Sequence, residues 1–361
     1  MDSIIKAVKK LFYYSTIFVL MLCCKNEKSE LLTIFVNTDA NTPLALSEIT
    51  SSLDSVKLEL TDQSLIKRPF RIVCSNDYIL VVELKSMILF DKNGKFIRNI
   101  GTIGQGPGEF TGIWDATMDA KNNFIYIISQ DNKRICYDID GNVLKEYRSK
   151  SSTPINSLHF VNDKLLLLCE KPVKKNGIRK NETYLYTLTP NLKNKDSIFI
   201  RSIDYKGIWL HPYKDFITND EEKTYLYYSD ITKNCFLIDT LLQLRNNKVV
   251  TNLHMDFKNK GLSPNGEKEI YIFNIYRNSR YVFAFYNATS KNQDYYFCHD
   301  TKTGKSYNMK DGYKDDIYTG ENVKIRPLNS DANQFYFLHT EISDTDLEEP
   351  NPTLYIGRLK K

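Results

Sequence analysis

Two short segments place a tryptophan beside a side chain that could bind or polarise a ligand. Asp115 follows Trp114 directly, and His211 lies two residues after Trp209. An aromatic face next to a carboxylate or an imidazole suits a sugar or a peptide side chain. In a closed fold built from repeated β-units, the loops that enter the units gather around one mouth of a central channel, where pockets commonly lie. Because both segments lie in such entry loops, we predict a binding surface there. Packing of these side chains in the core is the competing interpretation.

The histidines suggest a second kind of chemistry, but their spacing argues against it. Within the repeated β-units predicted from the sequence, His159 lies in the inner strand of its unit, His299 in the third strand of another, and His339 at the end of the second strand of a further one. A shared metal ion needs ligands at equivalent positions, so we predict no metal site and no cofactor. Ca²⁺ or Zn²⁺ would be needed only if the chain were a lyase or hydrolase acting at the channel. His159 and Asp115 are then the residues to test, and His159 joins the predicted binding residues.

The remaining motifs indicate structure. No GxSxG sequence occurs, and the adjacent carboxylates, such as Asp315 and Asp316, lie in polar loops. The segment GQGPGEF, with Gly104, Gly106, Pro107 and Gly108, lacks the Lys-Ser/Thr pair of a phosphate-binding loop and leads into a strand. We interpret it as a structural loop between two units, and we predict no catalytic residue.

The first residues resemble an export sequence. Lys6, Lys9 and Lys10 precede an apolar run, residues 11–22, that is too short to span a bilayer, and Cys23 and Cys24 follow. We predict a lipoprotein signal peptide over residues 1–23, with lipidation of Cys24 and a tether over residues 24–46. Lipidation of Cys23, or a signal peptide without lipidation, is the alternative. The apolar run at residues 31–36 could pair as an edge strand.

Composition narrows the class of protein. The 361 residues include 24 tyrosines and 19 phenylalanines, which suit half-buried strands, and the net charge is +5. Lys and Arg alternate with Asp and Glu without forming a basic stripe, so we predict no nucleic-acid partner. Single cysteines at 74, 136, 169, 235 and 298 have neither disulfide nor zinc-site spacing, and we predict that they are buried as small apolar side chains.

A recurring hairpin predicts the fold. The segment FDKNGKFIRNIG has an Asn-Gly turn between apolar runs, and YDIDGNVLKEY repeats its pattern about 47 residues later. Counting such units along residues 47–361 gives a six-bladed β-propeller of four-stranded antiparallel blades. The strand that ends at Leu60 would complete the last blade and close the ring. A β-sandwich or two smaller β-domains are the alternatives.

These features together resemble a known family. The lipobox-like start, SEITSSLDSVKLELTDQSLI, FDKNGKFIRNIGTIGQGPGEF, the YDIDGNVLKEY repeat, DTKTGK and NPTLYIGRLKK resemble the six-bladed, NHL-like β-propeller lipoproteins of Bacteroides and related gut bacteria. The resemblance implies export and anchoring at the outer membrane, facing the periplasm or the cell surface. It supplies no functional residues. We expect a binding or scaffold protein for a glycan, a peptide or a protein partner, with a metal-assisted propeller enzyme as the alternative.

Overall fold

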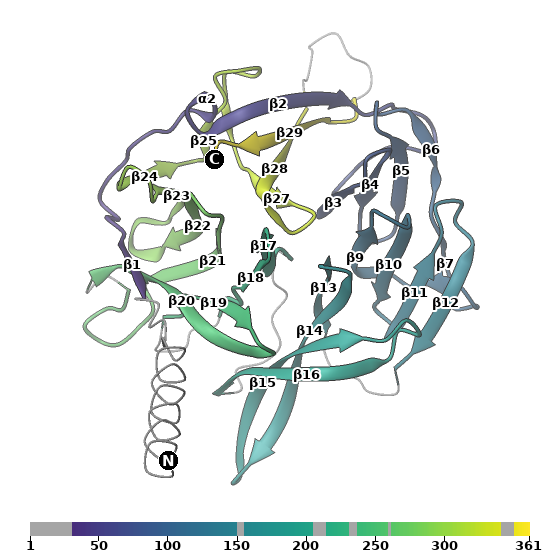
Figure 1. Cartoon of the computed structure of the whole chain (residues 1–361), viewed down its shortest axis with the longest axis horizontal. Coiled ribbons are helices and arrows are strands. Elements are labelled where there is room, and N and C mark those ends of the chain that lie inside the picture. The colour runs from purple at the N-terminus through teal and green to yellow at the C-terminus, as the bar shows by residue number, and fades with distance from the viewer. Residues whose placement is uncertain (1–30, 150–154, 205–213, 231–236, 259–260, 341–349) are drawn as a thin grey trace, which may run out of the picture. The chain divides into compact units, whose positions relative to one another are not determined.

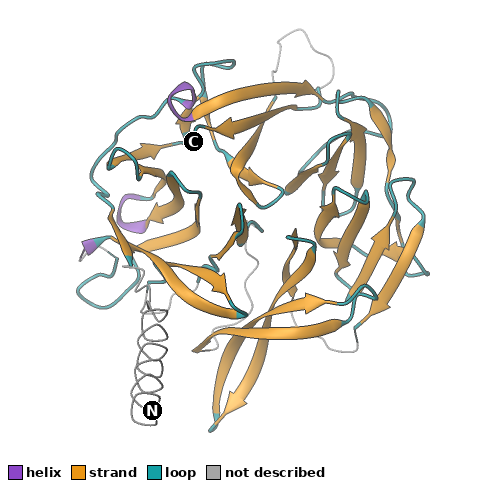
Figure 2. Ribbon diagram, viewed as in Figure 1, coloured by secondary structure: helices purple, strands orange, loops and turns teal. Residues whose placement is uncertain are grey.

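The computed structural model describes residues 31–149, 155–204, 214–230, 237–258, 261–340 and 350–361. Almost all of the regular structure is strand (Figure 2). Residues 33–361 form one compact unit. The expected signal peptide, Cys24, Trp209, His211 and Cys235 lie outside the described residues. No helix among the described residues is long and apolar enough to cross a membrane.

Four separate antiparallel sheets have four strands each, and each is built from strands that are consecutive in the sequence. The first contains β3 (Arg71–Cys74), β4 (Tyr78–Val82), β5 (Met87–Asp91) and β6 (Phe96–Asn99). The second contains β9 (Ile113–Asp119), β10 (Phe124–Ser129), β11 (Lys133–Tyr137) and β12 (Val143–Arg148). The third contains β13 (Ile155–Val161), β14 (Lys164–Lys175), β15 (Ile178–Leu188) and β16 (Asn194–Asp204). The fourth contains β21 (Ile270–Arg277), β22 (Tyr281–Ala288), β23 (Gln293–Asp300) and β24 (Lys305–Lys310).

The remaining long strands form one nine-stranded sheet instead of two further separate sheets. Its path runs through β1 (Leu32–Phe35), β20 (Lys248–Asp256), β19 (Thr240–Arg245), β18 (Lys223–Leu226), β17 (Ile217–Asp220), β28 (Asp331–His339), β29 (Thr353–Leu359) and β2 (Thr50–Lys57), and β27 (Arg326–Leu328) pairs with β28. A single parallel residue pair, Asn219 with Asp331, joins β17 to β28. The backbone N–H of Asn219 also donates to the carbonyl of Ser330 at 2.6 Å. This one contact merges two antiparallel groups of strands.

Four short strands complete the structure in two pairs. They are β7 (Thr102–Ile103) with β8 (Glu109–Phe110), and β25 (Tyr313–Lys314) with β26 (Asn322–Val323). The described residues also include two single helical turns, α2 (Leu46–Ile49) and the 3₁₀ turn η2 (Thr289–Lys291). Within residues 33–361 the sheets follow one another around a common centre, and β3, β9, β13, β17 and β27 lie nearest to it (Figure 1).

The predicted hairpins are present. Gly94 and Gly141 each take a positive φ, +87° and +85°, in the turns β5–β6 and β11–β12. In each turn the Asp three residues earlier accepts backbone N–H groups with its carboxylate, Asp91 in the first and Asp138 in the second. The repeated Asp-x-x-Gly spacing therefore reflects one turn geometry that is used twice.

The glycine-rich loop between the first two sheets is held by charged side chains. The backbone N–H of Gly106 donates to Glu109 Oε2 at 2.8 Å, and that of Gly108 donates to Glu146 Oε2 at 2.6 Å. The buried Lys133 ammonium donates to the carbonyls of Gly106 and Glu109 at 2.6 and 2.8 Å. Because these amides already have acidic acceptors of the protein itself, they are not available for a phosphate.

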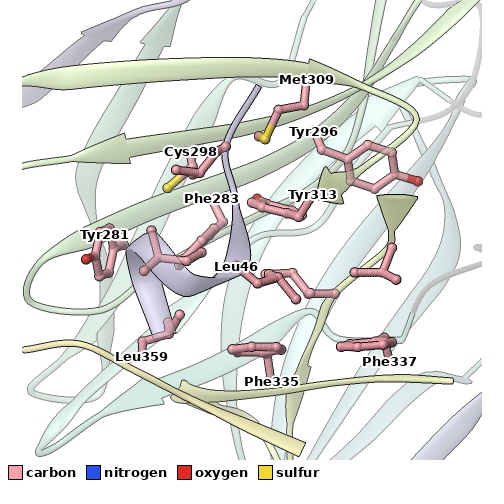
Figure 3. Close-up of a cluster of buried hydrophobic side chains, with 14 of the residues drawn as sticks. Leu46, Tyr281, Phe283, Tyr296, Cys298, Met309, Tyr313, Phe335, Phe337 and Leu359 are labelled. Carbon is pink, nitrogen blue, oxygen red and sulfur yellow. The ribbon is translucent and has the colours of Figure 1, made fainter. Parts of the chain in front are cut away.

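The two ends of the compact unit meet in one sheet. The strand β2 pairs antiparallel with β29 along its length, from Thr50 with Leu359 to Lys57 with Thr353. The helical turn α2 inserts Leu46 into a buried cluster with Phe283, Phe335 and Leu359 (Figure 3). The amino-terminal segment therefore packs against both the fourth sheet and the last strands.

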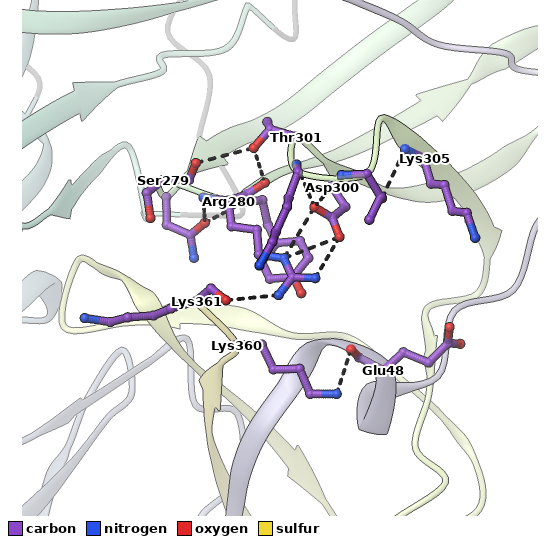
Figure 4. A network of polar contacts seen from close by, with 12 residues as sticks. Glu48, Ser279, Arg280, Asp300, Thr301, Lys305, Lys360 and Lys361 are labelled. Carbon is purple, nitrogen blue, oxygen red and sulfur yellow. Dashed lines mark hydrogen bonds and ion pairs between the residues drawn. The ribbon is translucent and has the colours of Figure 1, made fainter.

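Polar contacts secure the carboxy-terminal residues (Figure 4). The Arg280 guanidinium pairs with Asp300 at 2.9 Å and donates to the carbonyl of Lys361 at 3.1 Å. The Lys360 ammonium donates to the carbonyl of Glu48 in α2 at 3.0 Å. The last two residues thus connect α2 with the fourth sheet.

The described cysteines are buried and free, as predicted. They are Cys74, Cys136, Cys169 and Cys298. Burial raises the pKa of Cys74 to about 12 and that of Cys136 to about 11, so both thiols are neutral at physiological pH.

Candidate functional site

Three inner strands bring an arginine, an aspartate and a histidine together at the centre. Arg71 of β3 and Asp115 of β9 are 44 residues apart in the sequence, and His159 of β13 lies 88 residues after Arg71. Arg71 Nη1 donates to both carboxylate oxygens of Asp115 at 2.8 Å. The backbone N–H of Leu158 also donates to Asp115, at 2.7 Å. The carboxylate therefore joins three neighbouring sheets.

His159 is fully enclosed by polar partners. Its Nδ1 lies 2.9 Å from Ser330 Oγ and 3.4 Å from Arg71 Nη2, and its Nε2 lies 3.0 Å from Ser157 Oγ. Because a guanidinium only donates, Nδ1 is the acceptor and the ring proton is on Nε2. Burial, together with the positive charge of Arg71, holds the pKa of His159 well below 6.5. The imidazole is neutral and structural in this state.

The buried neutral His159 should make the fold sensitive to acid. The unfolded chain binds a proton at this histidine below about pH 6.5 and the folded chain does not. The unfolding free energy should therefore fall as the pH drops below 6.5, by up to about 1.4 kcal/mol for each pH unit. Urea unfolding of wild type and His159→Gln at pH 7.5 and pH 5 should show a flatter pH dependence in the variant. Equal slopes would contradict this assignment. Burial also lowers the pKa of His299, but less than that of His159, so His299→Gln is a graded control that should flatten the pH dependence less.

A second ion pair lies beside the first, because Arg326 contacts the backbone of the residue before Arg71. Arg326 of β27 donates from Nη2 and Nε to Asp215 Oδ2 at 2.6 and 2.9 Å, and from Nη1 to the carbonyl of Phe70 at 2.8 Å. Asp215 lies two residues before the start of β17. Its backbone carbonyl accepts a hydrogen bond from Asn274 Nδ2 of β21 at 3.3 Å. The Nε, Nη1 and Nη2 atoms of Arg326 therefore all donate to acceptors within the protein.

Burial and neighbouring charges shift the pKa values of Arg71 and Asp115 in opposite directions. Burial raises the pKa of Asp115, while the guanidinium of Arg71 and the ammonium of Lys214 oppose that rise. For Arg71, burial lowers the pKa, but the carboxylates of Asp115 and Asp215 outweigh it and raise the pKa. The Asp115 carboxylate depends on Arg71 for its charge, so neither residue is free to act as an independent acid or base.

Trp114 and Asp115, which were grouped by their adjacency in the sequence, lie at a bulge of β9. Asp115 lies opposite Ile128 and Ile113 lies opposite Ser129, so Trp114 is the extra residue of a β-bulge in β9. Trp114 and Ile128 both pack in the cluster between the second and third sheets, so Trp114 lies on the same side of the sheet as Asp115. The Lys214 ammonium lies 5.0 Å from the centre of the Trp114 ring. The structure therefore brings Asp115 and His159 together at the centre, and the Lys214 ammonium acts on both Trp114 and Asp115.

Sequence reasoning missed four residues of the centre: Arg71, Asp215, Asn274 and Arg326. The spacing of 44 residues between Arg71 and Asp115, repeated between Asp115 and His159, was available in the sequence. An alignment of the units by their inner strands would have placed Arg71 with the other two. No such spacing marks Asp215 or Asn274.

A small cavity of about 180 Å³ lies beside the second ion pair. Aromatic side chains of the fourth sheet and residues of the segment 324–327 line it, with Asp215 and Asn274 at its polar end. The rings of Phe285 and Tyr296 are stacked with their centroids 4.6 Å apart, and those of Tyr276 and Phe283 with their centroids 4.8 Å apart. These stacked pairs form an aromatic wall of the cavity.

A wider hollow of about 870 Å³ lies at the outer edge, between residues 60–69 and the strands near Leu338 and Pro350. We assign it no role. In the described part of the chain, no three His, Cys, Asp or Glu side chains are grouped so that one metal ion could bind them.

Sheets of mostly four antiparallel strands, arranged around a charged centre, define a β-propeller protein. The chain belongs to the family described as Domain of unknown function (DUF4934), which matches residues 31–356. No curated protein matches it.

Among solved structures, a Bacteroides fragilis NCTC 9343 protein named as exported shares 18% identity with the chain. The match covers 92% of this chain and 100% of that one, with a TM-score of 0.65, and it shows a common fold. The WD40 domain of Neurospora crassa Pan2 is less similar, at 10% identity over 81% of this chain and 76% of that one, with a TM-score of 0.43.

Proposed function

We propose that the chain is an exported, lipid-anchored, six-bladed β-propeller that works as a binding protein. The proposal of six blades divides the nine-stranded sheet at the Asn219–Asp331 pair. One part then contains β17 to β20, and the other contains β27, β28, β29 and β2. Together with the four separate sheets this makes six, in an NHL-like arrangement that β2 would close by pairing with β29.

Export and anchoring are supported by the amino-terminal sequence and by the name of the B. fragilis relative. A lipid on Cys24 would hold the propeller at the outer membrane without a spanning helix. Radiolabelled palmitate should be incorporated into the expressed chain and into Cys23→Ala, but not into Cys24→Ala. Labelling of the Cys24→Ala variant would contradict the choice of this cysteine.

The binding role rests on one observation, the aromatic cavity beside the Arg326–Asp215 pair. The charged side chains of the centre bind one another, as Arg71 binds Asp115 and Arg326 binds Asp215. Asn274 lines the cavity, and its Oδ1 is buried without a hydrogen-bond partner among the described residues. Buried polar atoms without partners are rare in native proteins, and a ligand can supply the missing donor.

Thermal unfolding with candidate ligands tests this function. Monosaccharides, short peptides and small aromatic acids are added in separate series to the wild type and to Phe285→Ala, which lacks one wall of the cavity. At least one series should raise the melting temperature of the wild type more than that of the variant, because a ligand at 100 times its Kd stabilises by about 2.7 kcal/mol. If no series stabilises the wild type, or if both proteins respond alike, this cavity is not the binding site.

A further inference from the structure

A β-bulge aims Asn274 into the cavity. In the pairing of β21 with β22, Ile272 lies opposite Tyr286, but Asn274 lies opposite Phe285, so Phe273 is the extra residue. Residues directly opposite on paired strands share a face of the sheet, and one inserted residue moves the following side chains to the other face. Asn274 and Tyr276 therefore stand on the face of Phe283 and Phe285, which forms the cavity wall. Without the bulge, Asn274 would point away from it.

The two ends of the cavity differ in charge and in hydrogen bonding. At the inner end, Asn274 is 7% exposed and its Oδ1 is an acceptor without a donor. At the outer end, Lys324 is exposed, and its ammonium lies 5.9 Å from the centre of the Tyr296 ring. Lys324 forms no ion pair with the residues that the structure describes. Stacked aromatic rings separate the acceptor from the cation.

We propose that the cavity binds a phenol ring that carries a carboxylate on a short chain. The inference rests on the proposed binding function and names its ligand class. The ring stacks between the aromatic side chains, the phenol hydroxyl donates to Asn274 Oδ1, and the carboxylate pairs with the Lys324 ammonium. Either a free hydroxyphenyl acid or the carboxy-terminal tyrosine of a peptide has this chemistry.

The same features disfavour the other ligand classes. A sugar carries a hydroxyl on most ring carbons, and each needs a polar partner when it is buried. The cavity offers few partners, because the Arg326 and Asp215 side chains already bind each other. A cationic amine would meet Lys324 at the mouth. A volume of about 180 Å³ accommodates one ring and not an oligosaccharide.

Isothermal titration calorimetry with four probes tests the inference on the processed lipoprotein in mild detergent. The probes are 3-(4-hydroxyphenyl)propionate, 3-phenylpropionate, tyramine and the peptide Gly-Gly-Tyr. We expect the hydroxyphenyl acid to bind about tenfold more tightly than the phenyl acid, since one buried hydrogen bond is lost. Tyramine should not bind detectably. Tighter binding of Gly-Gly-Tyr than of the free acid identifies a peptide terminus, and the reverse order identifies a free aromatic acid.

Two variants assign the polar contacts. Asn274→Leu should remove the difference between the hydroxyphenyl and phenyl acids, and Lys324→Gln should weaken both acids about tenfold without changing that difference. Lys302→Gln, at an exposed lysine of the same sheet region, is the matched control and should bind like the wild type. Because Lys324 is exposed, its variant remains informative even if Asn274→Leu does not fold.

Failure of this inference differs from failure of the proposed function. Binding of tyramine, equal binding of the two acids, or no effect of either variant would overturn the ligand class. If a monosaccharide or a non-aromatic peptide stabilises the wild type more than Phe285→Ala, the binding function stands and the phenol acid is wrong. If no ligand of any class does so, both proposals are overturned.

Discussion

Replacing Asp115 with alanine should lower the free energy of unfolding by about 3–5 kcal/mol. The change leaves the Arg71 guanidinium, whose side chain is 5% exposed, buried without its carboxylate. It also leaves the backbone N–H of Leu158 without an acceptor. Urea unfolding at pH 7, followed by circular dichroism, measures the loss.

Two comparisons control this prediction. The double variant Arg71→Met with Asp115→Leu removes both charges, and it should be considerably more stable than Asp115→Ala, because burying two apolar groups costs less than burying one unpaired charge. The Arg98–Asp140 pair, with side chains that are 44% and 64% exposed, is the matched surface pair. Asp140→Ala should cost less than about 1 kcal/mol. Equal costs for Asp115→Ala and Asp140→Ala would show that the central pair does not hold the sheets together.

Removing β2 should abolish folding. A chain that begins at Asp62 lacks α2 and β2, so it exposes the edge of β29 and loses Leu46 and Ile49 from the buried cluster. Full burial of each such side chain contributes about 1.5–3 kcal/mol, and an open edge promotes aggregation. We expect this chain to be insoluble or to lack a cooperative unfolding transition.

A shorter truncation is the control. A chain that begins at Thr38 loses β1, which is an edge strand, but keeps α2 and β2. It should remain soluble with a cooperative transition, at reduced stability because Ile34 and Val36 are buried in the intact chain. A soluble, cooperatively folding chain from Asp62 would contradict closure by β2.

The repeated hairpins could be predicted from sequence because their turns depend on local chemistry. An Asp that accepts backbone N–H groups and a glycine with positive φ, as at Asp91 and Gly94, are visible in a few residues. The nine-stranded sheet, in which β17–β20 join β27–β29 and β2, was harder to foresee. Their merging depends on the Asn219–Asp331 pair, which joins residues far apart in the sequence.

The candidate site was predicted only in part, for the same reason. Asp115 and His159 were chosen because of their residue types, and the structure brings them together. Trp114 was grouped with Asp115 through adjacency, and the β-bulge at Trp114, which keeps both side chains on one side of the sheet, was not visible in the sequence. The cavity depends on the bulge at Phe273, and one extra residue in a strand leaves no clear mark in a single sequence.

The pairing of β2 with β29 also sets the order in which the protein can mature. Ser51 and Arg358, which share a hydrogen bond across this pair, are 307 residues apart in the sequence. During synthesis, β2 emerges early, and its partner β29 is made only after the other strands that the structure describes. Contacts over such long separations slow folding, so the nascent chain exposes β2 without its partner until β29 has been made, and we expect it to depend on chaperones over that interval.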